Sequence, residues 1–246
     1  MYDLVRFSLQ DATDIGATLR SFGEGADSIE TVSNRCIHYL YNNLIDPQTG
    51  KPACALARFF KTHSYGDLSP TLQTHASGSL STAQALSDSV KCLTLLATVG
   101  ELPDWNDRHA SQGHQAIPLT SAQGVQGIPM IAQLIRSLGL EINSVVAPDP
   151  KLLMELERKT YNVFHIPEAL GSKYIPGQTN FVVPFGIRSV LGIGGMLASG
   201  DLFTIILFTK VAIPETTARL FKTLPLNIKM SILPFSNSQI FCTAMV

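Results

Sequence analysis

The sequence predicts an α+β fold, in α/β layers, whose central, mostly antiparallel sheet is flanked by helices. The last quarter of the chain contains three short apolar runs, Phe181–Ile187, Val190–Leu197 and Leu202–Thr209, and then a closing helix, Glu215–Ile232. Runs of 7 to 9 residues that are rich in β-branched and aromatic side chains and are separated by a Ser-Gly-Asp turn favour strands. Both faces of LFTIILF are apolar, which is typical of a central strand that is covered on both sides.

These apolar runs are too short to cross a membrane. Between Arg188 and Asp201 there are 12 residues, and between Asp201 and Lys210 there are eight. A spanning helix needs about 20 predominantly apolar residues. The first residues of the chain also lack the uninterrupted apolar segment of a signal peptide. We therefore expect a cytoplasmic protein without membrane insertion.

The overall charge of the chain gives no reason to expect nucleic acid as a partner. The formal net charge is −1, and charged residues make up 15% of the chain, against about 25% in typical soluble proteins. The four cysteines are scattered, without a CxxC pair, which favours reduced and mostly buried thiols over a disulfide framework or a zinc site. Cys54, at the start of an expected strand, is a candidate reactive thiol, although burial in the core is the better interpretation.

The front of the chain shows helical spacing followed by a strand. Asp11 or Asp14 is expected to cap a first helix that ends at Gly23. A second helix is expected to begin near Asp27 or Ser28, because apolar residues recur there at intervals of three and four: Ile29, Val32, Cys36, Leu40 and Leu44. After a turn, the run from Cys54 to Thr62 reads as a strand of the same sheet.

The middle of the chain is harder to interpret. Residues 64–88 are polar and remain unassigned, Val90–Gly100 reads as a short helix, and residues 101–127 read as a long polar loop. Residues 128–139 are expected to form a helix, since a proline stands at its first turn and a glycine at its end. Residues 142–147 read as a brief strand, with a helix capped by Asp149 after it. In the closing helix, Pro225 is expected to cause a kink or a break.

This order of elements resembles a GAF domain. The likeness is carried by two helices and a strand in residues 28–62, and by the "VPFGI" and "GIGGML" segments, the next strand, Ile213–Pro214 and the final helix in residues 142–235. The chain also resembles N-terminal sensor segments of bacterial multidomain histidine kinases. Residues 64–140 exceed what an ordinary GAF domain holds, so we expect a single elaborated domain over residues 1–240. No kinase, receiver or cyclase motif is present, and any output domain is expected outside this chain.

The resemblance implies a sensory domain of two-component signal transduction, with a ligand cavity walled by the segment 162–188. Polar side chains in this segment are candidate ligand contacts: Asn162, His165, Tyr174, Gln178, Asn180 and Arg188. Phe60, Phe164 and Phe185 are the expected apolar walls, because small-molecule sites are mostly apolar with a few polar groups. In the alternative interpretation, the segment is a surface loop whose side chains bond its own backbone.

Histidines are the candidates for a metal or haem site. His109 and His114 lie in the long polar loop, and His63 and His75 lie before it. A spacing of five does not place two histidines on one helix face, and no HExxH or CxxCH motif occurs. The sequence therefore predicts no metal and identifies no cofactor.

The glycines of "GIGGML" do not form a dinucleotide-binding loop. Leu197 stands where GxGxxG requires its third glycine, and no helix opens after the segment. Glycines inside a strand are better explained by close backbone approach or by a bulge.

The sequence is compatible with three functions. The first is a ligand-binding sensory module that works as a homodimer through its helical surfaces, with catalysis only in an output domain. The second is an interaction and dimerisation module with the same core and no small ligand. The third is an enzyme or sensor that uses the histidine-bearing loop to hold haem or a metal.

Overall fold

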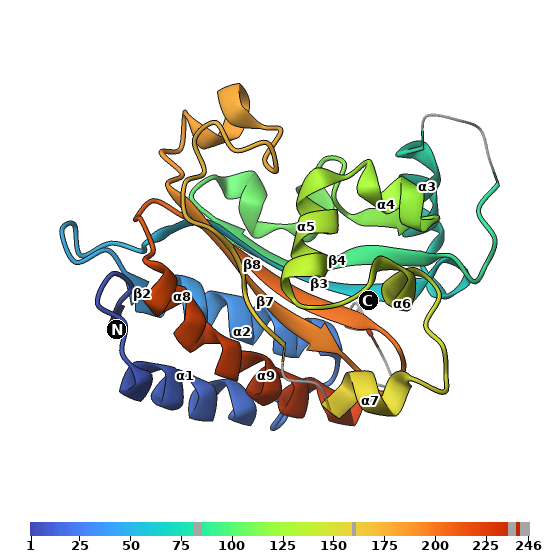
Figure 1. Cartoon of the computed structure of the whole chain (residues 1–246), viewed down its shortest axis with the longest axis horizontal. Helices are drawn as coiled ribbons and strands as arrows, with labels where there is room; N and C mark the ends of the chain where they lie inside the picture. Colours follow the sequence, from blue (N-terminus) through green and yellow to red (C-terminus); the bar gives the residue numbers. More distant parts are fainter. Residues whose placement is uncertain (81–84, 159–160, 236–239, 242–246) are drawn as a thin grey trace.

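A six-stranded antiparallel sheet runs through the molecule (Figure 1). The computed structural model describes residues 1–80, 85–158, 161–235 and 240–241. The spatial order of the strands is β5-β4-β3-β8-β7-β6. In chain order, their bounds are β3 (Cys54–Ser64), β4 (Lys91–Gly100), β5 (Ala116–Leu119), β6 (Phe164–Ile166), β7 (Ser189–Met196) and β8 (Leu202–Thr209). A separate parallel pair joins β1 (Tyr2–Asp3) to β2 (Leu44–Ile45).

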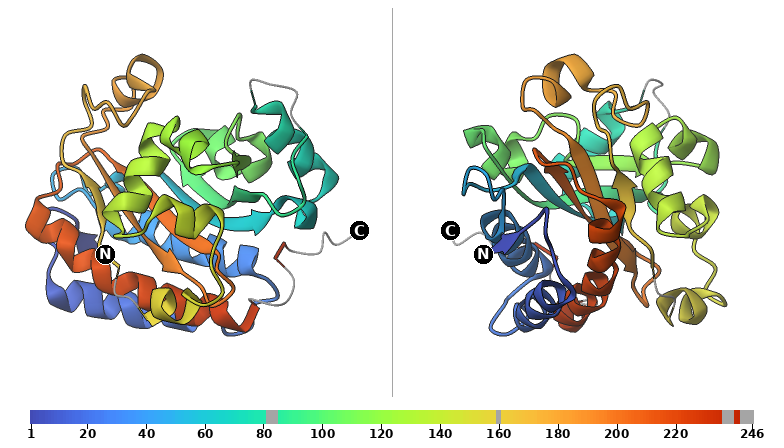
Figure 2. Two further views of the ribbon diagram at one scale, coloured as in Figure 1. Left: turned by 45° about the vertical axis from the view of Figure 1, so that its right-hand side comes forward. Right: turned by 60° about the vertical axis from the view of Figure 1, so that its left-hand side comes forward.

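The first helical layer covers one face of this sheet (Figures 1 and 2). It is made of α1 (Leu9–Ser21), α2 (Ile29–Asn43), α8 (Glu215–Leu220) and α9 (Leu224–Ile232). The predicted start of α2 is confirmed, because the Ser28 hydroxyl accepts a hydrogen bond from the Thr31 N–H at 3.2 Å. Its predicted apolar stripe is buried against the sheet.

The N-terminal end of α1 differs from the prediction. Ser8 is the N-cap, and Asp11 is the third helical residue, whose side chain accepts from the Ser8 N–H at 2.8 Å. This reciprocal arrangement is a capping box, which satisfies two N–H groups that would otherwise lack a partner. Asp14 takes no part in the cap. An acidic residue near a helix start is therefore not always the N-cap. Here the serine three positions before Asp11 is the N-cap, and its side chain accepts from the Asp11 N–H.

The second layer covers the opposite face with shorter elements (Figure 1). Helices α4 (Ala122–Gln126), α5 (Pro129–Ser137) and α6 (Ile142–Val146) bury their apolar side chains against the sheet. The predicted helix at Pro129 is confirmed. Helix α3 (Pro70–Gly78) packs near β5, and α7 (Leu153–Arg158) lies near β7. The sheet with its two helical layers confirms the α+β fold class.

The predicted central strands are confirmed. Strands β7 and β8 pair along their whole length, and every residue in both is buried. Strand β3 pairs with β8 on one side and with β4 on the other. The glycines of β7 allow close packing, since a Cβ atom on Gly192 would lie 2.8 Å from the Phe164 ring and one on Gly194 would collide with the backbone of Phe203. The expectation of close approach at these glycines is therefore confirmed.

The segment Val90–Gly100 is a correction, because it forms strand β4 and not a helix. Nine of its ten strand residues are buried, so buried and exposed residues do not alternate along the strand. Such a run does not distinguish a buried strand from a buried helix. The segment is a strand because it pairs with β3 along one edge and with β5 along the other. In the reverse direction, residues 142–147, predicted as a strand, contain helix α6.

The segment Phe181–Ile187 is a second correction. Its first two residues end a wide helical turn, Gln178–Val182, and tight turns follow. The strand that pairs with the outer side of β7 is β6. Pro184 has no N–H for a ladder, and Gly186 has a φ of +60°. The period-2 pattern of phenylalanine and valine therefore does not reflect a strand here.

The closing helix is divided, as Pro225 predicted. A short turn at Phe221–Thr223 separates α8 from α9, and the proline stands in the first turn of α9, where its missing N–H costs nothing. Across the described residues, no helix is both long and apolar enough to cross a membrane.

Candidate functional site

A cavity of about 490 Å³ lies between the sheet and the second helical layer. Its floor is formed by strands β3 and β8, and its walls come from the loop at 104–114, the start of α5 and the connection at 175–181. Cavities of about 300–1,000 Å³ with mostly apolar walls are typical of small-molecule sites. The cavity is therefore the candidate small-molecule site of the protein.

The floor of the cavity consists of side chains that alternate along two paired strands. Leu56, Arg58 and Phe60 of β3 point to this side, beside Ile206 and Phe208 of β8. Arg58 is directly opposite Ile206 in the strand register. A positive charge thus stands in the middle of an otherwise apolar floor.

An aromatic wall closes one side of the cavity around Trp105. The Trp105 ring centroid lies 4.5 Å from that of Phe185 and 5.6 Å from that of Phe181. The ring of Phe181 in turn meets that of Phe208 edge to face at 5.0 Å. Offset and edge-to-face pairs of this kind add about 0.5–1.5 kcal/mol to the burial of their area. The wall is therefore a packed unit that can hold its shape.

The backbone around Trp105 is fixed by short-range hydrogen bonds. The Thr98 hydroxyl donates to the Trp105 carbonyl at 2.9 Å. The Asn106 side chain accepts from the Gly100 N–H at 3.1 Å and donates to the Gly100 carbonyl at 3.0 Å. A Cβ atom at Gly100 would lie 2.8 Å from the indole, so glycine permits the ring to lie on the end of β4.

The connection that carries Phe181 is held by Gln178, which begins the same helical turn. Its amide NH₂ donates to the carbonyls of Ile175 at 2.8 Å and Ala169 at 3.1 Å, and its carbonyl accepts from the Gly171 N–H at 2.8 Å. For Gln178, the alternative interpretation of the segment therefore holds, because the side chain bonds its own loop. Asn180 lies at the exposed rim of the cavity.

Arg58 is the most unusual group in the cavity. Burial lowers the pKa of its guanidinium to about 10, so the group is still charged at neutral pH. Its Nε atom is buried and has no hydrogen-bond partner, and no ion pair to Arg58 occurs in the described part of the chain. The side chain as a whole is half-buried, so the unsatisfied atom is this Nε. A buried donor without a partner is costly, which points to a partner from outside the chain.

Two further polar groups lie on the same cavity. Ser111 is buried, and its hydroxyl has no partner among the residues that the structure describes. His114 lies at the mouth with its ring partly in solvent; the surrounding protein lowers its pKa, and the nearby charge of Arg58 lowers it further. The histidine is therefore neutral at neutral pH, and its single ring N–H is donated from Nδ1 to the Gln112 carbonyl at 2.8 Å.

The predicted apolar wall residues lie in three different places. Phe60 lines the cavity, and Phe185 stands behind the wall against Trp105. Phe164 is fully buried in the core, where it packs on Gly192. The structure thus brings one of the three to the cavity surface and a second into its supporting layer.

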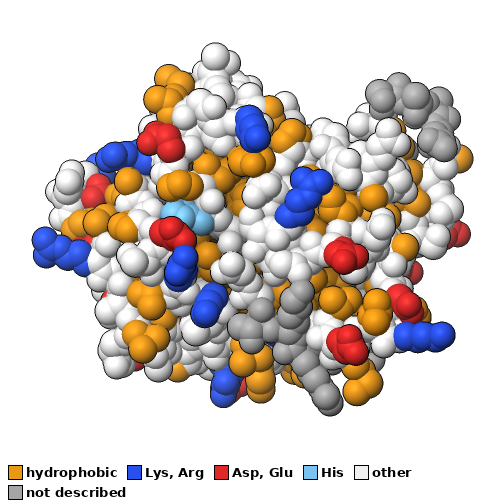
Figure 3. Space-filling model, viewed as in Figure 1, with side chains coloured by type: hydrophobic (Ala, Val, Ile, Leu, Met, Phe, Trp, Pro, Cys, Tyr) orange, Lys and Arg blue, Asp and Glu red, His pale blue; other side chains and the backbone are white. Residues whose placement is uncertain are grey.

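The predicted polar contacts are not brought together. Asn162 and His165 line a separate groove of about 800 Å³ beside β6, together with Glu215, Arg219 and Lys222 of α8 and the turn after it. Charged side chains of both signs gather with a histidine on the left half of the face in Figure 3. Burial lowers the pKa of His165, and its Nε2 atom has no partner in the described residues.

Tyr174 and Arg188 lie away from both hollows. The Tyr174 ring is half-buried, with the Lys173 ammonium 5.2 Å from its centroid. The Arg188 side chain is exposed, while its backbone N–H donates to the Thr209 carbonyl at 2.7 Å. Arg188 lies on the outer side of a turn, so its charge reaches water directly.

The other candidate metal ligands are also separated. His75 and His109 are exposed on different elements, and His63 is buried in β3. Within the described ranges, no group of three histidine, cysteine or acidic side chains could hold a metal ion. Cys36 and Cys54 are free and buried, and burial raises both of their pKa values to about 12, so these thiols are poor nucleophiles. Cys242 lies outside the described residues.

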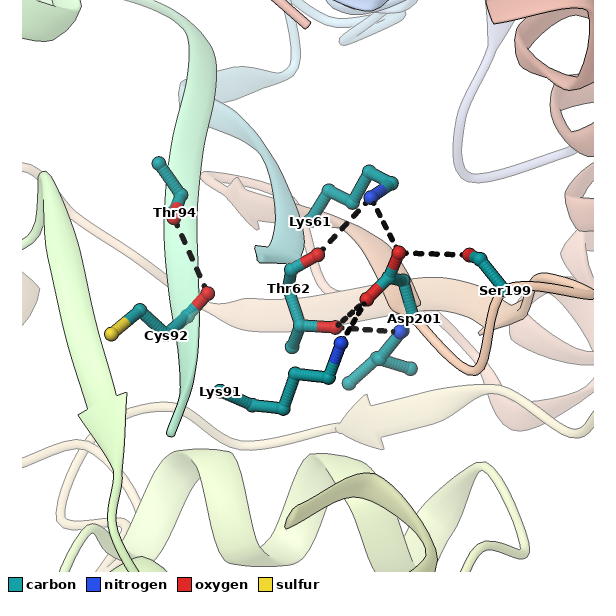
Figure 4. Close-up of polar contacts among 8 residues, drawn as sticks. Lys61, Thr62, Lys91, Cys92, Thr94, Ser199 and Asp201 are labelled. Atoms are coloured by element: carbon teal, nitrogen blue, oxygen red, sulfur yellow. Dashed lines mark hydrogen bonds and ion pairs between the residues drawn. The ribbon is translucent and has the colours of Figure 1, made fainter. Parts of the chain in front are cut away.

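A second cluster of charges is buried at the far end of β3 (Figure 4). Asp201 accepts from the Lys61 ammonium at 2.9 Å and from the Lys91 ammonium at 2.8 Å, and the Ser199 hydroxyl donates to it at 2.8 Å. Burial alone would raise the pKa of Asp201, but the two lysines outweigh it and lower the pKa to about 2. The cluster joins three strands, because Asp201 immediately precedes β8, Lys61 belongs to β3 and Lys91 begins β4.

His63 lies two residues from this cluster along β3. The side chain is 3% exposed, and neither ring nitrogen has a hydrogen-bond partner in the structure as described. Burial lowers its pKa well below 6.5, and the charge of Lys61 lowers it further. The folded protein therefore holds a neutral imidazole here.

Sequence reasoning missed Arg58, Trp105 and Ser111 as site residues. Arg58 carried a usable signal, since it is a lone charge in the middle of the apolar strand CALARFF. Trp105 and Ser111 lie in the stretch predicted as a loop, where pattern carries little information about position. The buried cluster around Asp201 had no signal either, because its two lysines come from 140 and 110 residues earlier in the chain.

The first prediction concerns the counter-ion of the two lysines. Replacing Asp201→Ala should lower the free energy of unfolding by about 3–5 kcal/mol, because it leaves buried ammonium groups without a partner. Urea unfolding at neutral pH measures the loss. Glu215→Ala is the control, since Glu215 pairs with Arg219 at an exposed site and should contribute less than about 1 kcal/mol. Equal losses in the two variants would contradict a buried, stabilising cluster.

The second prediction concerns pH. Because the folded pKa of His63 is below the unfolded value of 6.5, the unfolded state binds more protons in this window. Stability should be fully present above pH 6.5 and should fall as the pH drops below it, by up to about 1.4 kcal/mol per pH unit for this group. His63→Phe should flatten the curve of unfolding free energy against pH in that window. Parallel curves for the variant and the natural chain would show that His63 does not cause the slope.

Comparison with protein-family models, with curated proteins and with solved structures gave no match to this chain. Function is therefore inferred from the chemistry of the cavity and its surroundings.

Proposed function

We propose that this chain is a ligand-binding regulatory domain of a bacterial signalling protein, and that the cavity over β3 and β8 is its small-molecule site. The observation that supports this most directly is a charged, half-buried Arg58 whose buried Nε has no partner in the described residues, in a cavity with aromatic walls. Folded proteins rarely leave a buried hydrogen-bond donor without a partner unless the donor has a functional role. The GAF-like order of elements in the sequence agrees with this proposal.

The position of the cavity also suits a regulatory role. Its floor shares strands β3 and β8 with the layer of α1, α2 and α9, which covers their other face. A ligand that packs on Ile206 therefore lies one strand thickness away from side chains that contact those helices, such as Ile205 and Phe59. A shift of the sheet would reach the helical layer without any intermediate element. Buried thiols with raised pKa values suit a reducing cytoplasm.

A pair of variants on β8 tests whether the cavity takes a ligand. Ile206→Phe should fill the cavity, so that the variant loses any bound small molecule while its stability changes little. Ile205→Phe faces the filled layer and should cost about 1–3 kcal/mol by overpacking. Native mass spectrometry of the freshly purified proteins reports bound molecules, and urea unfolding reports stability. An empty natural chain, together with equal destabilisation by both variants, would contradict the proposal.

A second candidate function, as an interaction module, is favoured by the surface of α9. Leu226 and Met230 are 61% and 47% exposed, and Leu233 just after the helix is 44% exposed. Spacings of four and three place them on one side of the helix. A stripe of this kind suits pairing with a second copy of the chain, which we propose as the mode of dimerisation.

The dimer is tested by mass in solution. Light scattering at micromolar concentration should give twice the 26.7 kDa of one chain. The double variant Leu226→Glu, Met230→Glu should give the single-chain mass, because it places charges in the apolar contact. Leu170→Glu is the matched control, since that leucine is equally exposed but lies after β6. A natural chain that remains at 26.7 kDa would exclude dimerisation through α9 at this concentration.

A further inference from the structure

We propose that the ligand of this cavity is a small organic monocarboxylate with a flat apolar body, whose carboxylate is held by Arg58 and Ser111. This inference rests on the proposed function, namely that the cavity takes a small molecule. It adds the chemical class of that molecule and the two side chains that select it.

The contrast between two cations on β3, the buried Lys61 and the half-buried Arg58, supports an anionic ligand. Lys61 has an acid of the chain beside it, since Asp201 lies at 2.9 Å. Arg58 lies three residues earlier, and the described residues provide it with no acidic partner. A guanidinium offers a planar set of N–H donors that matches the two oxygens of a carboxylate. The chain thus satisfies one of these charges internally and presents the other to the cavity.

The second anchor is the Ser111 hydroxyl. It lies on the same cavity, it is buried, and it has no partner among the described residues. A carboxylate accepts about four hydrogen bonds, so it can use the arginine fork and a hydroxyl together.

The charge balance favours a singly charged ligand over a phosphate. Among the described side chains that line the cavity, Arg58 is the permanent cation and Asp104 is an acid at the exposed rim. The lowered pKa of His114 keeps this histidine neutral at neutral pH. Asp104 at the rim repels either kind of anion, but the single positive charge of Arg58 matches a monoanion and leaves half of the charge of a dianion unmatched.

The remaining walls describe the rest of the ligand. Trp105, Phe181 and Phe208 form a contiguous aromatic surface, and Phe60 lies on the floor beside Arg58. Aromatic rings pack best against flat or apolar groups in offset or edge-to-face geometry. An aryl or similarly flat apolar group attached to a carboxylate therefore fits both ends of the cavity.

The probes are 3-phenylpropionate and its neutral isostere 3-phenylpropionamide. Trp105 is the single tryptophan of the chain and lies in the wall, so its emission reports occupancy directly. Calorimetric titration gives an independent affinity. The carboxylate should bind about ten- to a hundredfold more tightly than the amide, which is the effect of a hydrogen-bonded charge.

Three variants separate the role of Arg58 from general damage. Arg58→Met should abolish the preference for the carboxylate, yet the unliganded variant should unfold at the same or a higher temperature, since a buried N–H donor without a partner is removed. Arg58→Lys should keep part of the preference, because it retains the charge without the fork. Arg188→Met is the control and should leave affinity unchanged, since Arg188 is exposed on a turn.

Each other result has a defined meaning. If the amide binds as tightly as the carboxylate, or if Arg58→Met melts at a lower temperature and keeps the preference, the carboxylate proposal is overturned while the cavity remains a small-molecule site. If neither probe binds but a molecule co-purifies with the protein, its measured charge decides, and a neutral molecule overturns the proposal. If neither probe binds and native mass spectrometry finds no bound molecule, the proposed function itself fails.

Discussion

Coverage of the central sheet on both faces is the constraint from which the other features follow. Strands β7 and β8 have no exposed residue, and β3 is almost as deeply buried between β4 and β8. In such a position, every backbone group must be paired within the sheet, and every side chain must be apolar or find a partner. The glycines of β7 allow neighbouring groups to pack closely on that strand. The threonines of β8 are polar but find partners, because their hydroxyls donate to carbonyls of β7.

The two layers meet this constraint differently, and the difference locates the cavity. On one face, α1, α2 and α9 present continuous stripes that fill the space above the sheet with one large core. On the other face, α4 and α6 have five residues each, and loops cover much of the sheet. Short helices and loops cannot interdigitate along a whole strand in the way that long helices do. A hollow over β3 and β8 is the consequence.

The charges of β3 show the same constraint in two outcomes. Lys61 is neutralised by Asp201 at the start of β8, and together with Lys91 this pair ties three strands at one end of the sheet. Arg58, farther along the strand and on the face of the cavity, is left without a partner within the described chain. A stability requirement alone would favour an apolar residue at that position. Retention of the charge is therefore better explained by binding, in line with the usual conflict between stability and function at sites.

The sequence by itself determined the class of the fold, the central strands β3, β7 and β8, and the helices whose apolar residues repeat at three and four positions, such as α2 and α5. These features depend on local periodicity, which survives without knowledge of the partners. Only the tertiary structure decided that Val90–Gly100 is a strand and that Phe181–Ile187 is not, because a buried apolar run becomes a strand only where neighbouring edges are free to pair. The site was decided in the same way. Phe60 was predicted, but Arg58, Trp105 and Ser111 line the same cavity because β3, the end of β4 and the following loop fold over one another. Contacts between residues so far apart in the chain leave no periodic trace in it.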